Sequence, residues 1–121
     1  MGEPARHHTI NYIEIAVAAV DRAKTFYNSV FGWNFTDYGP DYASFSAENA
    51  GIDGGLRTAN ASRTSAPDEP LIVLYSEDLD CTQAGILAAG GAIVVPTFEF
   101  PGGRRFHFSD GVGNVLAVWS E

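Results

Sequence analysis

Glu14 is the acidic side chain best placed to take part in chemistry. It interrupts the otherwise uncharged segment of residues 12–16, and strand alternation puts it on the same face as Tyr12. A carboxylate in this position could act as a general base, ligate a metal ion or balance a cationic substrate. Alternatively, it could pair with an arginine or lie in solvent at the edge of a cleft. The sequence leaves both interpretations open.

His107 is a second candidate, because histidine has a reference pKa near neutral pH and can transfer protons there. It is the only histidine outside the terminal pair His7 and His8. Its neighbours Phe106 and Phe108 are also compatible with a structural, hydrogen-bonded histidine. We therefore take His107 and Glu14 as the candidate catalytic residues.

Two arginines could hold an anionic group, since a guanidinium makes charge-assisted hydrogen bonds. Arg57 lies two residues beyond Gly55 on one strand face, and could instead pair with Glu14. Arg104 and Arg105 follow a Gly-Gly turn and alternate between faces, so one of them is expected to enter a cleft. Of these two we take Arg105 as the candidate.

Aromatic side chains are numerous enough either to line an apolar pocket for a planar ligand or to fill the core. The residues concerned are Trp33, Phe35, Tyr38, Tyr42 and Trp119. As candidate ligand-binding residues we take Tyr12, Arg57, Arg105, Trp33 and Trp119.

Composition limits the classes of function. The 121 residues suffice for one domain, and 45% hydrophobic residues allow a real core. The net charge of −8, with no basic cluster, disfavours a nucleic-acid partner. No apolar run approaches the roughly 18 residues of a membrane span, and the N-terminus lacks the features of a secretory signal. The single cysteine, Cys81, indicates a cytoplasmic protein without an internal disulfide.

An internal repeat divides the chain into two halves. At a constant offset of 59 residues, Ile13 corresponds to Ile72, and the same offset pairs Asp21 with Asp80. Repeat one is expected at about residues 9–58, a linker at 59–70 and repeat two at about 71–119, all within one domain spanning residues 1–121. Each half opens with an apolar strand, a turn containing Asp, and a helix closed by Gly.

The periodicity predicts helices at about residues 20–31 and 80–89. Apolar positions in the first helix follow the spacing of a core-facing stripe, and Gly32 fits the left-handed residue after its end. Strands are expected at residues 10–17, 33–38, 42–46, 52–58, 71–76, 92–95, 103–109 and 115–119. The order in each half is βαβββ, which makes the protein α+β. Two such sheets could curl around a shared cleft, with the helices on their outer faces.

Two motifs carry a family resemblance. The first, at residues 13–33, is an aliphatic strand, an Asp-containing turn and a helix with Phe26-Tyr27 that ends in Phe31-Gly32. The second, at residues 106–116, is similar to a closing strand, an Asp-Pro-Asp-Gly-Asn turn and a final strand, with Gly-Val replacing Pro-Asp. Together they resemble the glyoxalase/bleomycin-resistance/dioxygenase (vicinal oxygen chelate) superfamily over residues 10–119. The resemblance implies two βαβββ modules forming a curved mixed sheet around a cleft.

The resemblance also implies where a metal would bind. Metal-dependent members place His or Glu on the first and fourth strands of each half, so that a divalent ion chelates vicinal oxygens of the substrate. The four corresponding positions here are Tyr12, Gly55, Leu71 and Ala117. Three have no donor atom, and a phenol with a reference pKa of about 10 is a poor ligand by itself. We therefore expect no metal or other cofactor.

Two functional hypotheses follow, and the substrate is open in both. The first is a metal-free protein that binds a small molecule in its cleft, as drug-sequestering members of the family do. The second is a metal-dependent lyase, isomerase or dioxygenase that uses non-standard ligands such as Glu14 and His107. The resemblance implies a homodimer in either case. The net charge and the lack of a long apolar run argue against a nucleic-acid or membrane partner.

Overall fold

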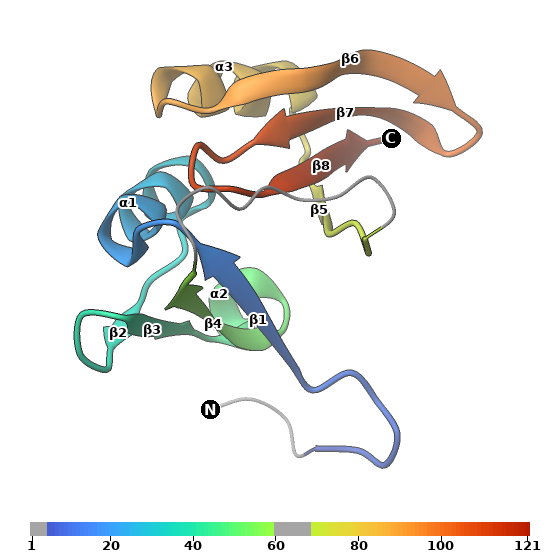
Figure 1. Ribbon diagram of the computed structural model, residues 1–121. Helices are drawn as coiled ribbons and strands as arrows, with labels where there is room; N and C mark the ends of the chain where they lie inside the picture. The colour runs from blue at the N-terminus through green and yellow to red at the C-terminus, as the bar shows by residue number, and fades with distance from the viewer. Residues whose placement is uncertain (1–4, 60–68) are drawn as a thin grey trace.

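Two βαβββ units make up residues 5–59 and 69–121, the part of the chain that the structure, a computed structural model, describes (Figure 1). The elements of the first unit are β1 (Tyr12–Val17), α1 (Val20–Phe31), β2 (Thr36–Asp37), β3 (Tyr42–Phe45), α2 (Ala47–Ala50) and β4 (Asp53–Thr58). Those of the second are β5 (Val73–Tyr75), α3 (Leu79–Ala88), β6 (Ala92–Phe100), β7 (Gly103–Ser109) and β8 (Val115–Ser120). Most of the predicted linker, residues 60–68, lies outside the described residues. In the described part, no helix combines the length and apolar character needed to span a membrane.

Helix α1 has the bounds that the sequence predicts. Its stripe buries Ala23, Phe26 and Tyr27, and Asp21 stands in the first turn, where a carboxylate favours the free N–H groups. Gly32 ends the helix with φ of 75°, and its N–H donates to the carbonyl oxygen of Asn28. Glycine adopts this left-handed conformation at little cost, which explains why the helix stops there.

Each unit forms its own four-stranded mixed sheet. The strand order is β1-β4-β3-β2 in the first sheet and β5-β8-β7-β6 in the second. In the parallel pair of β1 and β4, Glu14 lies opposite Gly55; in that of β5 and β8, Val73 lies opposite Ala117. The two sheets do not close into one, so β1 and β5 are both edge strands. On the first sheet, the face that carries Tyr12 and Tyr42 is open, since a pocket lies on it.

Strands β1 and β5 each begin two residues later than predicted, and three other elements differ further. Strand β6 continues to Phe100 through Pro96, because an edge strand tolerates a residue without an N–H, and its pairing with β7 is irregular around that point. Strand β2 is shorter than predicted, since Trp33 turns into the core. Helix α2 was not predicted. It is a single turn of four residues, too short to produce a periodic pattern.

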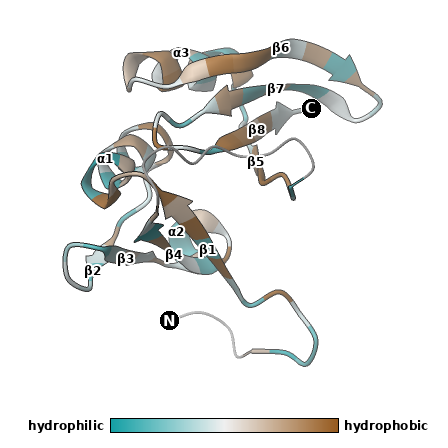
Figure 2. Cartoon of the chain, viewed as in Figure 1, coloured by the Kyte–Doolittle hydropathy of each residue, from teal (hydrophilic) through white to brown (hydrophobic). Residues whose placement is uncertain are grey.

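One hydrophobic core extends through both units. Phe26 of α1 stacks on Phe108 of β7 at a centroid distance of 6.1 Å, and Phe31 lies 5.9 Å from the same ring. Hydrophobic residues gather along β1 and β8, the strands at the junction of the two units (Figure 2). Burial of these side chains is the main favourable contribution to the free energy that holds the two units together.

A buried carboxylate reinforces the junction. Asp110, in the turn between β7 and β8, is 3% exposed and accepts a 2.6 Å hydrogen bond from the hydroxyl of Tyr27. It also accepts hydrogen bonds from the backbone N–H groups of Val112 and Asn114. The side chain of Asn114 in turn donates to the carbonyl oxygen of Ala16 in β1, at 2.8 Å. The turn of the second unit is thereby fastened to the first strand and first helix.

Replacing Tyr27 by Phe removes one donor to a buried carboxylate and should lower the free energy of unfolding by about 1.5–3 kcal/mol at neutral pH. Burial, and then the neighbouring Asp110, raise the pKa of Tyr27 well above its ordinary value. The wild type should therefore lose stability as the pH rises above about 10, where only the unfolded tyrosine ionises. Urea unfolding between pH 7 and 11 measures both effects.

Tyr38→Phe is the matched control, because the Tyr38 side chain is exposed and its hydroxyl has no hydrogen-bond partner among the described residues. It should leave stability unchanged. The Tyr27→Phe variant should show a weaker loss at high pH than the wild type. Equal alkaline slopes for Tyr27→Phe and wild type would contradict the assigned role of this phenol.

Candidate functional site

The open face of the first sheet carries a chain of hydrogen bonds that ends on Glu14. The hydroxyl of Tyr42 donates to Glu14 Oε2 at 3.1 Å and is hydrogen-bonded to the hydroxyl of Tyr12. Because the single hydroxyl proton of Tyr42 goes to the carboxylate, Tyr12 donates to Tyr42. Strand alternation placed Tyr12 and Glu14 on one face correctly. The participation of Tyr42, which lies 28 residues from Glu14, was not foreseen.

Gly55 makes this arrangement possible. A Cβ atom at this position would lie 2.5 Å from Cζ of Tyr42, closer than real Cβ atoms approach other atoms. The tyrosine ring therefore rests directly on the backbone of β4. On the opposite face, Phe45 lies against Gly54 in the same way, with its Cζ 2.5 Å from where a Cβ would be. The Gly-Gly pair thus admits one aromatic ring on each face of the strand.

Arg57 completes the cluster. Its Nε lies 3.3 Å from Glu14 Oε1, the carboxylate oxygen that Tyr42 does not use, so the pairing that the sequence suggested is present. About half of each side chain is exposed, and such a pair contributes little to stability. Its effect is to compensate the charge of Glu14. Burial, followed by the hydrogen bonds with Tyr12 and Glu14, raises the pKa of Tyr42 well above its ordinary range, so this phenol stays protonated.

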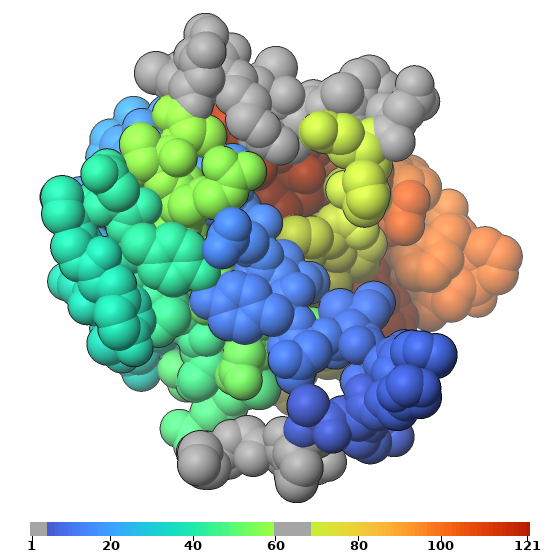
Figure 3. All heavy atoms as spheres, turned by 60° about the horizontal axis from the view of Figure 1, so that its bottom comes forward, coloured from blue at the N-terminus to red at the C-terminus, as the bar shows by residue number. Residues whose placement is uncertain are grey.

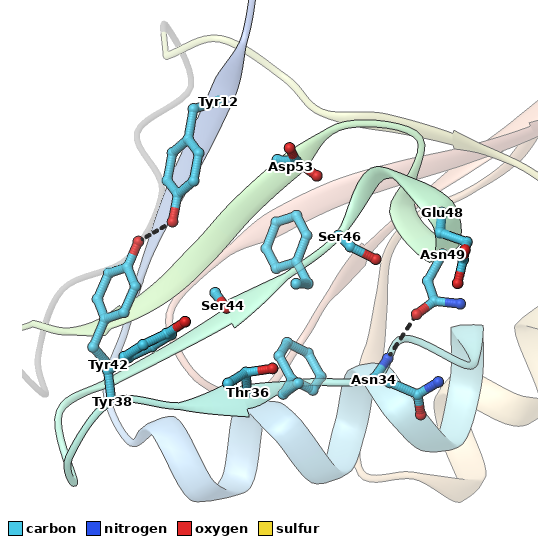
Figure 4. A pocket seen from close by; sticks show the side chains of 12 residues that line it. Tyr12, Asn34, Thr36, Tyr38, Tyr42, Ser44, Ser46, Glu48, Asn49 and Asp53 are labelled. Carbon is cyan, nitrogen blue, oxygen red and sulfur yellow. Dashed lines mark hydrogen bonds between the residues drawn. The ribbon is translucent and has the colours of Figure 1, made fainter. Parts of the chain in front are cut away.

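A pocket opens beside this cluster, over β2, β3 and α2 (Figure 4). We call it the first-sheet pocket. Its cavity volume is about 750 Å³, within the range of small-molecule sites. The lining residues are Tyr12, Asn34, Phe35, Thr36, Tyr38, Tyr42, Ser44, Phe45, Ser46, Glu48, Asn49 and Asp53.

Short polar contacts hold the wall of the first-sheet pocket. Asp53 Oδ1 accepts a 2.7 Å hydrogen bond from the N–H of Ala47 and so fixes the start of α2. Asn49 Oδ1 accepts from the N–H of Asn34 at 3.3 Å, which ties α2 to the segment before β2. Hydroxyl groups remain along the floor with no hydrogen-bond partner among the described residues, namely those of Thr36, Ser44 and Ser46.

The second sheet holds the remaining charged candidates. Arg105 and His107 lie on one face of β7, opposite Trp119 and Ala117 of β8. The Arg105 guanidinium stands 5.3 Å from the ring centroid of Phe98, a cation–π distance. Burial, and then the charge of Arg105, lower the pKa of His107, so its ring is neutral at pH 7. Arg105 Nε and His107 Nε2 are buried without a hydrogen-bond partner in the described part of the chain.

The sequence candidates therefore do not converge on one point. Tyr12, Glu14 and Arg57 form one cluster on the first sheet, whereas Arg105, His107 and Trp119 belong to the second. Trp33 is 5% exposed and stacks on Tyr27 in the core, where it also forms part of an apolar groove between the units. None of the candidates on the second sheet lines the first-sheet pocket.

The apolar groove lies between β1, α2 and β5 and has a cavity volume of about 780 Å³. Ile10, Leu71, Val73 and Tyr75 are exposed along it. In Figure 3, β1 (blue) lies between the teal and green residues of the first sheet and the yellow residues of β5. Edge strands of both sheets therefore border this groove.

Sequence reasoning missed much of the first-sheet pocket. Glu48, Asp53 and Asn49 come from α2 and the start of β4, and the unrecognised single helical turn concealed their proximity. One signal was available: the Gly54-Gly55 pair inside a predicted strand marks a close approach by another group. The approaching groups are the ring of Tyr42 at Gly55 and the ring of Phe45 at Gly54.

Comparison with known proteins assigns the fold. The family model for the glyoxalase/bleomycin resistance protein/dioxygenase superfamily matches residues 9–118, and the chain belongs to this family. A glyoxalase-related enzyme from Fulvimarina pelagi superimposes with a TM-score of 0.75 at 16% identity, covering 94% of this chain and 88% of that one. The genomically encoded fosfomycin resistance protein of Listeria monocytogenes gives the same TM-score and identity, with 96% and 95% covered.

Among curated sequences, the chain is 23% identical over 120 residues to a Mycobacterium bovis protein named "Putative glyoxylase CFP32". The alignment covers 94% of this chain and 46% of the mycobacterial protein. The chain thus spans about half the length of the curated relatives that it matches.

The side chains at the four positions where the resemblance implies metal ligands do not fit a metal ion. Gly55 has no side-chain donor atom and is covered by the ring of Tyr42. Ala117, which is fully buried, and Leu71 also have no donor atom in their side chains. The hydroxyl of Tyr12 is engaged in a hydrogen bond with that of Tyr42. In residues 5–59 and 69–121, no group of three or more His, Cys, Asp or Glu side chains could hold a metal.

Gly55→Ala should displace the ring of Tyr42 from β4 and lower the free energy of unfolding by about 1–3 kcal/mol. The pKa of Tyr42 should then move down toward its ordinary value, which a spectrophotometric titration of the tyrosines detects. In a Tyr42→Ala background the same glycine substitution should cost little, since the nearest atoms to the added Cβ all belong to Tyr42.

Gly85→Ala in α3 is the control. Its added Cβ would meet no atom within 4 Å, so it should leave the tyrosine titration unchanged and stabilise the helix by about 0.5–1 kcal/mol. An equal cost of Gly55→Ala with and without the Tyr42 ring would show that the glycine serves another purpose.

Proposed function

We propose that this protein binds a small organic molecule in the first-sheet pocket without the divalent metal of its metal-dependent relatives. The observation that carries the proposal is the ring of Tyr42, which lies over Gly55, one of the four positions where the resemblance implies a metal ligand. Hydrogen bonds to Tyr12 and Glu14 hold the ring there. The pocket beside it offers aromatic surface, hydroxyl groups and carboxylates, which are the usual means of holding a small ligand.

The alternative, a metal-dependent lyase, isomerase or dioxygenase that uses Glu14 and His107, has less support. Glu14 is engaged by Arg57 and Tyr42 in the first sheet, while His107 lies in the second sheet. Their separation argues against a shared ion. A glyoxylase activity is named for the mycobacterial relative, and it carries over to this chain only as part of this alternative.

The proposal includes a single cytoplasmic domain that assembles as a homodimer. Apolar side chains on the second unit support the dimer: Val73, Tyr75 and Phe98 are each more than a third exposed. So does the apolar groove along the edge strands, which a second copy would cover. Sedimentation equilibrium should give a mass of twice the 13.0 kDa of the chain, and a monomer at micromolar concentration would remove this part of the proposal.

The metal content tests the central claim. Protein purified without added metal should carry far less than one Zn, Ni, Mn or Fe per chain by plasma mass spectrometry. Its melting temperature should not change with EDTA, because a metal bound to the folded state would stabilise it by mass action. One tightly held ion per chain, together with a lower melting temperature in EDTA, would establish the metal-dependent alternative instead.

A further inference from the structure

The first-sheet pocket contains negative charge that nothing in its lining compensates. Glu48 and Asp53 line it, and its lining residues include no Lys, Arg or His. Neither carboxylate forms an ion pair with a described residue, in contrast to Glu14, which pairs with Arg57. Asp53 uses Oδ1 to accept from the N–H of Ala47, which leaves Oδ2 for a ligand. In a chain of net charge −8, this pocket repels anions and attracts cations.

Three tyrosines form the opposite end of the pocket. Figure 4 shows Tyr12, Tyr38 and Tyr42 grouped there, with Glu48 and Asn49 at the far end and Ser44 and Thr36 between. Tyr38 is 64% exposed and Tyr12 is 47% exposed, so their rings are accessible. The rings of Tyr38 and Tyr42 stand 6.5 Å apart at an interplanar angle of 58°. Accessible aromatic faces bind cations through the negative potential above the ring.

The same donor set does not suit a transition-metal ion. Such an ion is held by several convergent anionic or imidazole ligands, and no group of three or more His, Cys, Asp or Glu side chains exists in the part of the chain that the structure describes. An organic cation has different requirements: aromatic faces for its alkyl or aryl body, a diffuse negative potential, and hydroxyl oxygens as hydrogen-bond acceptors. The pocket supplies all three.

We propose that the first-sheet pocket is specific for organic cations, that is, for ligands with an ammonium or guanidinium group on an aromatic or hydroxylated body. The cationic group lies near Glu48 and Asp53, and the body lies against the tyrosine rings. Glu14 takes no direct part in cation recognition, because Arg57 already compensates its charge. This inference rests on the proposed function, since it names the ligand class of the same pocket.

Three probes of similar size and different charge test the inference. Benzylammonium, benzyl alcohol and benzoate are titrated into the full chain, and binding is followed by the NMR chemical shifts of the tyrosine rings. Benzylammonium should bind about tenfold more tightly than benzyl alcohol, as expected for one ion pair or cation–π contact, and benzoate should not bind. Added salt should weaken only the benzylammonium interaction.

Variants locate the site. Glu48→Gln and Tyr38→Leu should each weaken benzylammonium binding several-fold, while Glu77→Gln, an equal change of charge before α3 in the second unit, should have no effect. Both Glu48 and Tyr38 are exposed, so the variants should fold, which their melting curves verify. Equal binding of benzylammonium and benzyl alcohol, preferred binding of benzoate, or an unchanged affinity in Glu48→Gln would each overturn the inference.

The two proposals fail separately. If benzylammonium binds as expected to a protein that holds one metal per chain, the ligand class stands and the metal-free function does not. If a metal-free protein binds benzyl alcohol or benzoate in preference, the function stands and the ligand class is wrong. If no probe shifts the tyrosine signals, the ligand class is wrong, and the metal analysis still decides the proposed function.

Discussion

The buried carboxylate of Asp110 is the contact on which the rest of the structure depends. A charge with 3% exposure is tolerable only when hydrogen bonds replace its lost hydration, and Tyr27, Val112 and Asn114 supply them. These partners come from α1 and from the turn before β8. Since Asn114 also binds the carbonyl oxygen of Ala16, the end of β1 is held in place. The strand that carries Tyr12 and Glu14 therefore has a defined position relative to the second unit.

On that support, β4 determines what the first sheet can bind. Two adjacent glycines let Tyr42 and Phe45 approach the strand from opposite faces. The ring of Phe45 belongs to the core, and the ring of Tyr42 covers Gly55 on the face that bears Glu14. A single pair of residues without side chains thus serves both the packing of the unit and the chemistry of its open face. Any larger residue at either position would have to move a ring.

Charge on the first unit is divided between two environments. Glu14 is compensated by Arg57 and anchors the phenols of the hydrogen-bonded chain. Glu48 and Asp53, in the neighbouring pocket, have no cationic partner in the described residues. The carboxylate that stood out in the sequence is thus paired with an arginine, whereas the two that attracted no notice line the pocket. This difference in charge compensation is the physical basis for proposing organic cations as the ligand class of the first-sheet pocket.

The sequence by itself determined the elements whose signals are local. The bounds of α1 follow from a helical stripe and Gly32, and the βαβββ repeat follows from spacing along the chain. Only the tertiary structure decided which side chains meet. The ring of Tyr42 reaches Glu14 because β3, β4 and β1 pair in one register, and that register depends on side chains far apart in sequence. The tertiary structure also places His107 in a different sheet from Glu14. The sequence could not show this, because periodicity indicates which face of an element is buried and not which other element packs against that face.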